Sequence, residues 1–148
     1  MEIPVVRDVL EESNALAEQN RASLVSADVF AVNIMSSPGA GKTTLLQRTI
    51  RLLQAQGKSC GVIEGDITTT LDSERLAPLG VPVVQVNTQP FGGDCHIGAH
   101  LVQAALRHFD RPVLDYLFIE NIGNLVCPAE FDLGEHRKVV VLSLPEGE

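Results

Sequence analysis

The chain alternates between short apolar runs and longer amphipathic stretches. Five runs rich in β-branched and other apolar residues predict strands at about 29–35, 60–64, 83–87, 114–120 and 139–144. Between these runs, apolar residues recur at helical spacing and predict helices at about 44–56 and 97–108, with a short helical segment ending near 79–80. Strands that alternate with helices are typical of an α/β fold with a mostly parallel sheet and helices on both faces.

The first part of the chain has a different pattern. From Pro4 to about Leu24 it is polar, with a narrow apolar stripe that predicts a packing helix without chemistry of its own. We therefore interpret the 148 residues as one domain, with an N-terminal helical arm at 1–26 and a core at 27–148. The last predicted strand has no covering helix, so we expect this core to be C-terminally truncated.

A glycine-rich turn joins the first predicted strand to the next helix. A strand, then a glycine turn, then Lys-Thr opening a helix is the context of a phosphate-binding P-loop. The glycines let backbone N–H groups point at phosphate oxygens, and the helix N-terminus adds the positive end of its dipole. Lys42 would contact the terminal phosphates and the Thr43 hydroxyl would ligate Mg²⁺. The predicted nucleotide-binding residues are Ser37, Pro38, Gly39, Ala40, Gly41, Lys42, Thr43 and Thr44.

Two acidic residues lie at or just beyond the carboxyl ends of predicted strands. In open α/β sheets, ligands bind at the carboxyl ends of the strands. Asp66, which follows the strand at 60–64, is therefore a candidate to reach Mg²⁺ directly or through water, with helix capping as its alternative role. Glu120 begins the sequence Glu-Asn-Ile-Gly, which resembles the DxxG element of P-loop GTPases with Glu in place of Asp.

Cys95 and His96 lie at a predicted junction between a loop and a helix, and Cys127 lies in the loop after the fourth strand. Thiolate and imidazole ligands suit borderline-soft cations such as Zn²⁺ or Ni²⁺. Judged by spacing alone, buried free cysteines explain the pattern equally well, and His96 with His100 forms a competing pair four residues apart. Cys60, inside a predicted strand, is expected in the core.

Composition narrows the choice of partners and compartment. The formal net charge of -8 argues against nucleic-acid and anionic-membrane partners, since both favour a basic face. No run approaches the roughly 18 apolar residues that span a bilayer, and the first residues lack a signal-peptide pattern. Three cysteines without framework spacing fit a reducing compartment, so we expect a cytoplasmic protein.

Taken together, these motifs are similar to one known family. The P-loop turn, Val62 to Asp66, the Cys95-His96 pair and above all the block from Phe118 to Glu135 resemble the HypB family. These proteins are the nickel-binding GTPases of [NiFe]-hydrogenase maturation and are related to the urease accessory protein UreG. The resemblance covers essentially the whole chain, and it implies that Ser36, which replaces the first glycine of the usual P-loop motif, is a family variant.

The resemblance implies a slow GTPase and metallochaperone that delivers nickel, with metal binding and dimerisation coupled to the nucleotide. It implies GTP, Mg²⁺ and either Ni²⁺ or Zn²⁺ as ligands, a homodimer, and partners among other hydrogenase-maturation proteins and the hydrogenase large subunit. The catalytic residues would be Lys42, Asp66 and Glu120. Mg²⁺ would lie near Thr43, Asp66 and Glu120. Nickel or zinc would be held by Cys95, His96 and Cys127, at or near a subunit interface.

The chain also departs from the family pattern. It has no CxxCGC motif and no guanine-reading NKxD motif, so the preference for GTP rests on the resemblance and we expect weak activity. Gly98 stands where an Asp is common, and the loop before Cys95 is longer than usual. Arg75 is the one candidate for an arginine acting in the same chain. The alternatives are a nucleotide-independent Zn/Ni-binding module, a UreG-like accessory GTPase, or a P-loop kinase for a small metabolite.

Overall fold

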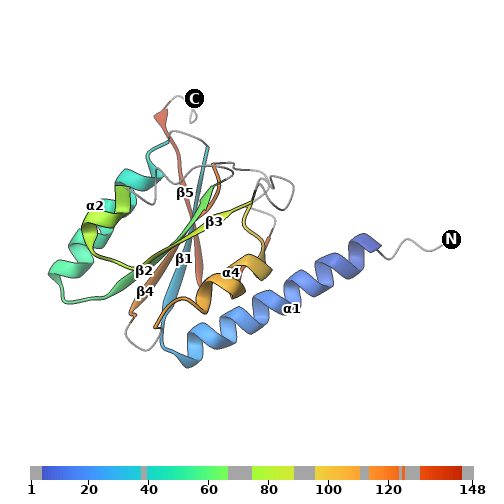
Figure 1. Ribbon diagram of the computed structural model, residues 1–148. Coiled ribbons are helices and arrows are strands. Elements are labelled where there is room, and N and C mark those ends of the chain that lie inside the picture. The colour runs from blue at the N-terminus through green and yellow to red at the C-terminus, as the bar shows by residue number, and fades with distance from the viewer. Residues whose placement is uncertain are drawn as a thin grey trace.

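The computed structural model describes residues 5–37, 40–66, 75–88, 96–110, 114–123, 125 and 131–144, with the backbone alone at 5–10 and at 66. A five-stranded sheet forms its centre (Figure 1). Helices α1 (Val5–Ser26) and α4 (Ala99–Leu106) cover one face of the sheet, and α2 (Lys42–Ala55) covers the other. The prediction of an α/β fold with helices on both faces is confirmed.

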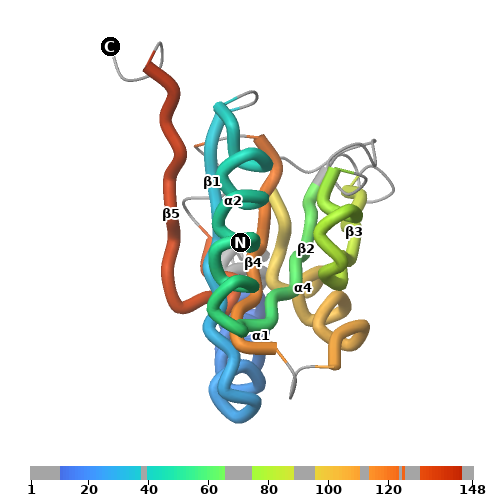
Figure 2. Tube along the Cα trace, turned by 90° about the vertical axis from the view of Figure 1, so that its left-hand side faces the viewer, coloured from blue at the N-terminus to red at the C-terminus, as the bar shows by residue number. Residues whose placement is uncertain are grey.

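The five strands are all parallel, and their order in the sheet is β3-β2-β4-β1-β5. Figure 2 shows this order across the sheet, with β5 at one edge and β3 at the other. The carboxyl ends of parallel strands meet at one edge, so residues that follow β1, β2 and β4 come together there. The strands are β1 (Phe30–Ser36), β2 (Cys60–Asp66), β3 (Val83–Asn87), β4 (Tyr116–Glu120) and β5 (Arg137–Val141).

A hydrophobic cluster lies on each face of the sheet. On the α2 side, Leu46 packs in a cluster with Phe118 of β4. On the α1 and α4 side, Leu24 and Val102 pack in a cluster with Ile119, the next residue of β4. The two β4 residues belong to different clusters because successive side chains of a strand point to opposite faces. Burying one such side chain stabilises the fold by about 1.5–3 kcal/mol.

Glycines with left-handed backbone follow two of the elements. Gly57 follows α2 with φ 76°, and its N–H donates to the carbonyl oxygen of Gln54 at 3.0 Å. Gly80 follows the 3-10 turn η1 (Ala77–Leu79) with φ 70°. Both positions need the left-handed backbone that glycine adopts without steric cost.

Some boundaries differ from the sequence prediction. The last strand, predicted at 139–144, is β5 at Arg137–Val141. Its ladder with β1 pairs Val141 with Ser36, so β5 ends where β1 ends although the apolar run continues to Leu144. The helix predicted at 97–108 is likewise shorter, at Ala99–Leu106. In the described part of the chain, no helix combines the length and the apolar character needed to cross a bilayer.

Candidate functional site

The structure describes both ends of the turn between β1 and α2. The Ser36 hydroxyl donates to the carbonyl oxygen of Ser37 at 2.8 Å. Gly41, immediately before α2, has φ 95° and ψ 22°. A Cβ added at Gly41 would meet no atom within 4 Å, so glycine is required there by conformation and not by space. Pro38 and Gly39 lie outside the described residues.

A polar pocket of about 350 Å³ opens at the N-terminus of α2. It is lined by residues 40–44 together with Arg75 and Glu120. Among the described residues, no side chain caps the first turn of α2, and that turn contains no acidic residue. The backbone N–H groups of this turn are therefore available to an anion, and the helix dipole favours negative charge there.

Thr43 and Glu120 meet inside this pocket. The Thr43 hydroxyl donates to Oε1 of Glu120 at 2.6 Å, and the two residues are only 5% and 1% exposed. The second oxygen of Glu120, Oε2, is also buried and has no hydrogen-bond partner among the described residues. A buried carboxylate with so little compensation favours a cation beside it. A carboxylate and a hydroxyl are oxygen ligands of the kind that Mg²⁺ prefers, so these residues fit that ion.

Two further residues surround the pocket. Asp66 ends β2, the strand beside β4, but its side chain lies outside the described residues, so its predicted role stays a prediction. Arg75 lines the pocket, and its Nη2 donates to the Thr44 hydroxyl at 3.4 Å. Gln47 on α2 holds the same segment by donating to the carbonyl oxygen of Arg75 at 2.9 Å. The pocket therefore contains two cationic side chains, Lys42 and Arg75.

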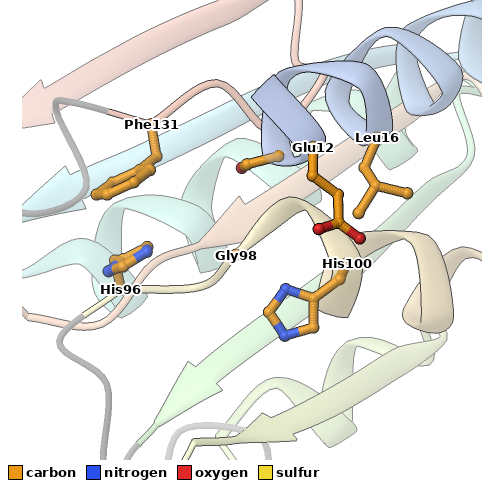
Figure 3. Close-up of a pocket in the computed structure, with 7 residues that line it drawn as sticks. Glu12, Leu16, His96, Gly98, His100 and Phe131 are labelled. Atoms are coloured by element: carbon orange, nitrogen blue, oxygen red, sulfur yellow. The ribbon is translucent and has the colours of Figure 1, made fainter. Parts of the chain in front are cut away.

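Of the predicted nickel or zinc ligands, only His96 belongs to the described residues. Cys95 and Cys127 lie outside them. The imidazole of His96 stacks on the ring of Phe131, with a centroid distance of 4.1 Å and an interplanar angle of 4°. Figure 3 shows the two rings face to face at one side of a pocket. The stacking fixes the plane of the imidazole ring. Phe131 covers a face of this ring and not its nitrogens, which bind metal ions in the plane of the ring.

This second pocket has a volume of about 400 Å³ and lies between α1 and the start of α4 (Figure 3). His100 also lines it, and its imidazole folds over Gly98, where an added Cβ would lie 2.8 Å from Nδ1. In the described ranges, no three His, Cys, Asp or Glu side chains come together as a metal site. The competing His96–His100 pair therefore gains no third ligand of these types from the described part of the chain.

Sequence reasoning missed a chain of buried polar residues on the α1 and α4 side of the sheet. Oδ1 of Asn121 accepts the N–H groups of Ile97 and Ile122 at 3.1 and 2.9 Å. Nδ2 of Asn121 donates to Oδ1 of Asn33 at 3.2 Å, and Nδ2 of Asn33 donates to Oε2 of Glu135 at 3.0 Å. One signal was available, because Asn33 interrupts an apolar strand and a buried amide needs partners.

Two carboxylates at the end of this chain have opposite pKa shifts. Burial raises the pKa of Glu135 above its ordinary value, although the hydrogen bond from Asn33 acts against this. Burial also opposes ionisation of Asp132, but two hydrogen bonds from Arg21 at 2.7 and 2.8 Å and one from the Gly134 N–H hold its pKa below the usual range. Arg21 belongs to α1, so the ion pair attaches this helix to the 131–135 segment.

Cys60 is a core residue, as the sequence predicts. Its side chain is buried in the cluster on the α2 side. Burial, with a smaller contribution from Asp115, raises the pKa of the Cys60 thiol to about 11. The thiol is therefore protonated at neutral pH, which makes it a poor nucleophile.

A known family model matches most of the chain. The CobW/HypB/UreG nucleotide-binding domain matches residues 30–141. This segment includes all five strands, the polar pocket at α2 and His96.

Several curated relatives are similar over nearly the whole chain. The hydrogenase maturation factor HypB of Azotobacter vinelandii is 49% identical over 144 residues, which are 97% of this chain and 46% of the relative. HypB of Escherichia coli K12 is 48% identical over 95% of this chain and 47% of its own length. The probable HypB of Methanocaldococcus jannaschii is 41% identical over 99% of this chain and 64% of its own length. The chain thus spans about half to two thirds of the length of these relatives.

Two solved structures are similar in fold and sequence. The crystal structure of HypB from Helicobacter pylori in complex with nickel matches with a TM-score of 0.83 and 34% identity, over 91% of this chain and 62% of that one. The structure of HypB from Archaeoglobus fulgidus matches with a TM-score of 0.81 and 40% identity, over 93% of this chain and 64% of that one. The strand order and the P-loop turn described above thus occur in a chain that is similar to HypB proteins throughout.

Proposed function

Because the chain belongs to the CobW/HypB/UreG nucleotide-binding family, we propose that it is the nucleotide- and metal-binding core of a GTP-hydrolysing metallochaperone. Its task is to deliver nickel during [NiFe]-hydrogenase maturation. The observation that carries the proposal is the hydrogen bond between Thr43, in the first turn of α2, and the buried Glu120 at the end of β4. This bond joins the polar pocket at the N-terminus of α2, which we call the phosphate pocket, to β4. That strand precedes the segment that contains Cys127, one of the proposed metal ligands.

In the proposed reaction, water attacks the γ-phosphate of GTP to give GDP and phosphate. The N–H groups of residues 40–44 bind the phosphates, and Lys42 places its charge on the terminal ones. Arg75 lies close enough to line the same pocket, so it is the candidate to neutralise charge that develops on the leaving group. We expect slow turnover, and Arg75 is the one candidate in this chain for an arginine that would accelerate hydrolysis by contacting the phosphates.

Thr43 and Glu120, together with Asp66, would hold Mg²⁺. When bound there, Mg²⁺ would supply positive charge that offsets the negative charge of the phosphates. The buried Oε2 of Glu120 and the lone pairs of the Thr43 hydroxyl supply oxygen ligands, while the hydrogen bond between the two residues keeps them oriented. The catalytic residues in this proposal are Lys42, Asp66 and Glu120.

Nickel is the cargo in this proposal, with zinc as the other metal that the donor set accepts. Cys95, His96 and Cys127 would be its ligands, and the stacked Phe131 would hold the His96 ring. Support comes from the similarity to a HypB that was crystallised in complex with nickel.

We further propose a cytoplasmic homodimer that works with other hydrogenase-maturation proteins and the hydrogenase large subunit. Within each chain, residues 1–26 form the arm and residues 27–148 form the core.

The GTPase assignment is tested by Lys42→Ala, which we expect to abolish GTP hydrolysis measured as phosphate release with Mg²⁺ present. Lys58→Ala is the matched control, because Lys58 follows the far end of α2 and does not line the phosphate pocket. The control should hydrolyse GTP at the wild-type rate. A Lys42→Ala protein that hydrolyses GTP as the wild type does would overturn the assignment.

The coupling between nucleotide and metal is tested by equilibrium dialysis with Ni²⁺, and separately with Zn²⁺, with and without GTP and Mg²⁺. We expect the metal affinity to change with the nucleotide, and Cys95→Ala to weaken metal binding in both conditions. Metal binding that ignores the nucleotide would instead favour the nucleotide-independent metal-binding module.

A further inference from the structure

Glu120 and Asn121 are adjacent residues that serve opposite faces of the sheet. Glu120 lies in the phosphate pocket, where its Oε1 accepts the Thr43 hydroxyl at 2.6 Å. Asn121 reaches the other face, where its Oδ1 accepts the N–H of Ile97 at 3.1 Å. Successive side chains of an extended segment point in opposite directions, so a stretch of two residues contacts both regions.

The backbone at this position is held firmly. The N–H of Asn121 donates to the carbonyl oxygen of Ile34 at 3.0 Å, near the end of β1. The same strand continues to Ser36 and into the phosphate-binding turn. Residues 120 and 121 are therefore attached to β1, and we expect a change in the position of Glu120 to move Asn121 as well.

From Asn121, one branch of contacts reaches the backbone beside His96. Ile97 directly follows His96, and its N–H is bound by the Asn121 amide oxygen. The Ile97 side chain is fully buried and packs against Gly65 of β2, where an added Cβ would lie 2.5 Å from Cδ1. Residue 97 is thus fixed through both its backbone and its side chain, and so is the backbone to which His96 is attached.

A second branch reaches the ring of His96. Nδ2 of Asn121 donates to Asn33, which donates to Glu135, and Oε1 of Glu135 accepts the N–H of Leu133 at 3.5 Å. Phe131, two residues earlier in the same segment, carries the ring that stacks on His96. Asn33, Asn121 and Glu135 are 0%, 1% and 8% exposed, so these bonds are shielded from competing water.

We propose that Asn121 is the positioning residue that couples the nucleotide pocket to the metal-binding segment at His96. The inference rests on the proposed function, because it requires that nucleotide and nickel both bind. Nucleotide binding at the Glu120 side selects one arrangement of residues 120–121, and Asn121 transmits it to the backbone and the ring of His96. Linkage then requires that nickel change nucleotide affinity by the same factor by which nucleotide changes nickel affinity.

The test measures Ni²⁺ affinity of the full chain with and without a non-hydrolysable GTP analogue and Mg²⁺, and the affinity of the analogue with and without Ni²⁺. We expect a coupling factor of roughly 5–150 in the wild type. Asn121→Ala should bring this factor to about 1 while each ligand measured alone still binds within a few-fold of the wild type. Asn87→Ala is the matched control, since Asn87 also ends a strand but accepts its hydrogen bond from Gln85. The control should keep the wild-type factor.

The outcomes separate the inference from the proposed function. A wild-type factor of 1 overturns both. Wild-type coupling that persists in Asn121→Ala overturns the inference alone. Loss of affinity for each ligand measured alone, with the factor unchanged, shows a merely structural role and also overturns it. Asn121→Asp keeps an acceptor for the Ile97 N–H but loses the donor to Asn33 and adds a buried charge, so it should retain less coupling than the wild type.

If Asn121→Ala does not fold, hydrogen exchange of the wild type decides the question. The GTP analogue with Mg²⁺ should slow exchange of the Ile97 amide, because that N–H is the one bound by Asn121. The amides of β3 should exchange at an unchanged rate, since β2 lies between that strand and β4. An Ile97 amide that does not respond to the analogue, in a protein whose nickel affinity does respond, contradicts the proposal.

Discussion

At the scale of single residues, the candidate site depends on polar side chains that are buried and yet paired. Thr43 and Glu120 form such a pair at the phosphate pocket, and Asn33, Asn121 and Glu135 form a chain on the opposite face. Removing one partner leaves the other without compensation in a dry environment, which costs more than the net strength of the bond. Stability and function should therefore change together at these positions.

Thr43→Ala should lower the free energy of unfolding by about 1–3 kcal/mol, because it leaves the buried Glu120 without its hydroxyl donor. It should also abolish the effect of Mg²⁺ on nucleotide affinity. Urea unfolding and nucleotide titrations with and without Mg²⁺ measure the two effects. Thr43→Ser keeps the hydroxyl and should behave as the wild type. A Thr43→Ala protein with unchanged stability and unchanged Mg²⁺ dependence would show that the pair has neither role.

Cys60 allows a prediction about pH. With a thiol pKa of about 11, the reactive thiolate is about one part in a thousand at pH 8, against about a quarter for an ordinary thiol. Iodoacetamide at pH 8 should therefore leave Cys60 unmodified in the folded protein. In about 6 M guanidinium chloride, which unfolds the protein, it should modify Cys60 readily. Mass spectrometry of the peptide that contains Cys60 gives the readout. Equal labelling in both conditions would contradict the assigned burial.

At the scale of elements, α1 is attached to the core by specific contacts as well as by its apolar stripe. Nδ2 of Asn20 donates to the carbonyl oxygens of Ala99 and Leu133, both at 3.0 Å. Gly134 lies so close to the helix that an added Cβ would be 2.6 Å from the carbonyl oxygen of Ala17. The helix thus bridges the start of α4 and the 131–135 segment. These are the two parts of the chain next to His96 and Phe131, whose rings stack on each other.

Gly134→Ala should break this attachment. Gly134 has φ 95°, and the new methyl group would meet backbone atoms of α1, which have little freedom to move. Gly57→Ala is the control, because Gly57 also has positive φ but an added Cβ there meets nothing within 4 Å. Urea unfolding should show a loss of about 1–2 kcal/mol for the control and about 1–3 kcal/mol more for Gly134→Ala. Equal losses in the two variants would mean that α1 can move away at little cost.

At the scale of the whole molecule, β5 lies at one edge of the sheet, and none of the described residues forms a strand on its outer side. β5 pairs with β1 on one side, and it is the last strand in the sheet order. Its apolar residues Val139 and Val140 are exposed. An exposed strand with unpaired backbone groups and apolar side chains readily pairs with another chain, so this edge is the expected site of self-association.

Val140→Lys should raise the protein concentration at which light scattering detects aggregates, because charge on an edge strand opposes pairing. The change in unfolding free energy should stay within about 0.5 kcal/mol, since Val140 is half exposed. Val25→Lys makes the same chemical change on the exposed side of α1 and should leave aggregation unaltered. If both variants shift the onset equally, net charge and not the β5 edge controls aggregation.

Much of the fold follows from local pattern. The apolar strand, the glycine-rich turn and the Lys-Thr pair that opens α2 are contiguous in the chain, so the strand, the helix and the place of the turn between them were predictable. Gly57 and Gly80 were predictable as helix ends for the same reason, because left-handed backbone at a helix C-terminus favours glycine. Alternation of strands and helices was enough to predict the parallel sheet.

The sequence by itself thus determined the parallel α/β fold and the place of the glycine-rich turn before α2, since both depend on periodicity and short-range backbone preference. Only the tertiary structure decided that β4 lies between β1 and β2, and this placement brings Glu120 to Thr43 and Asn121 to Asn33. It also decided where β5 ends, because the ladder with β1 and not the apolar run sets that boundary. These contacts join residues far apart in the chain, and hydrophobic periodicity carries no information about which strands are neighbours or which buried polar side chains meet.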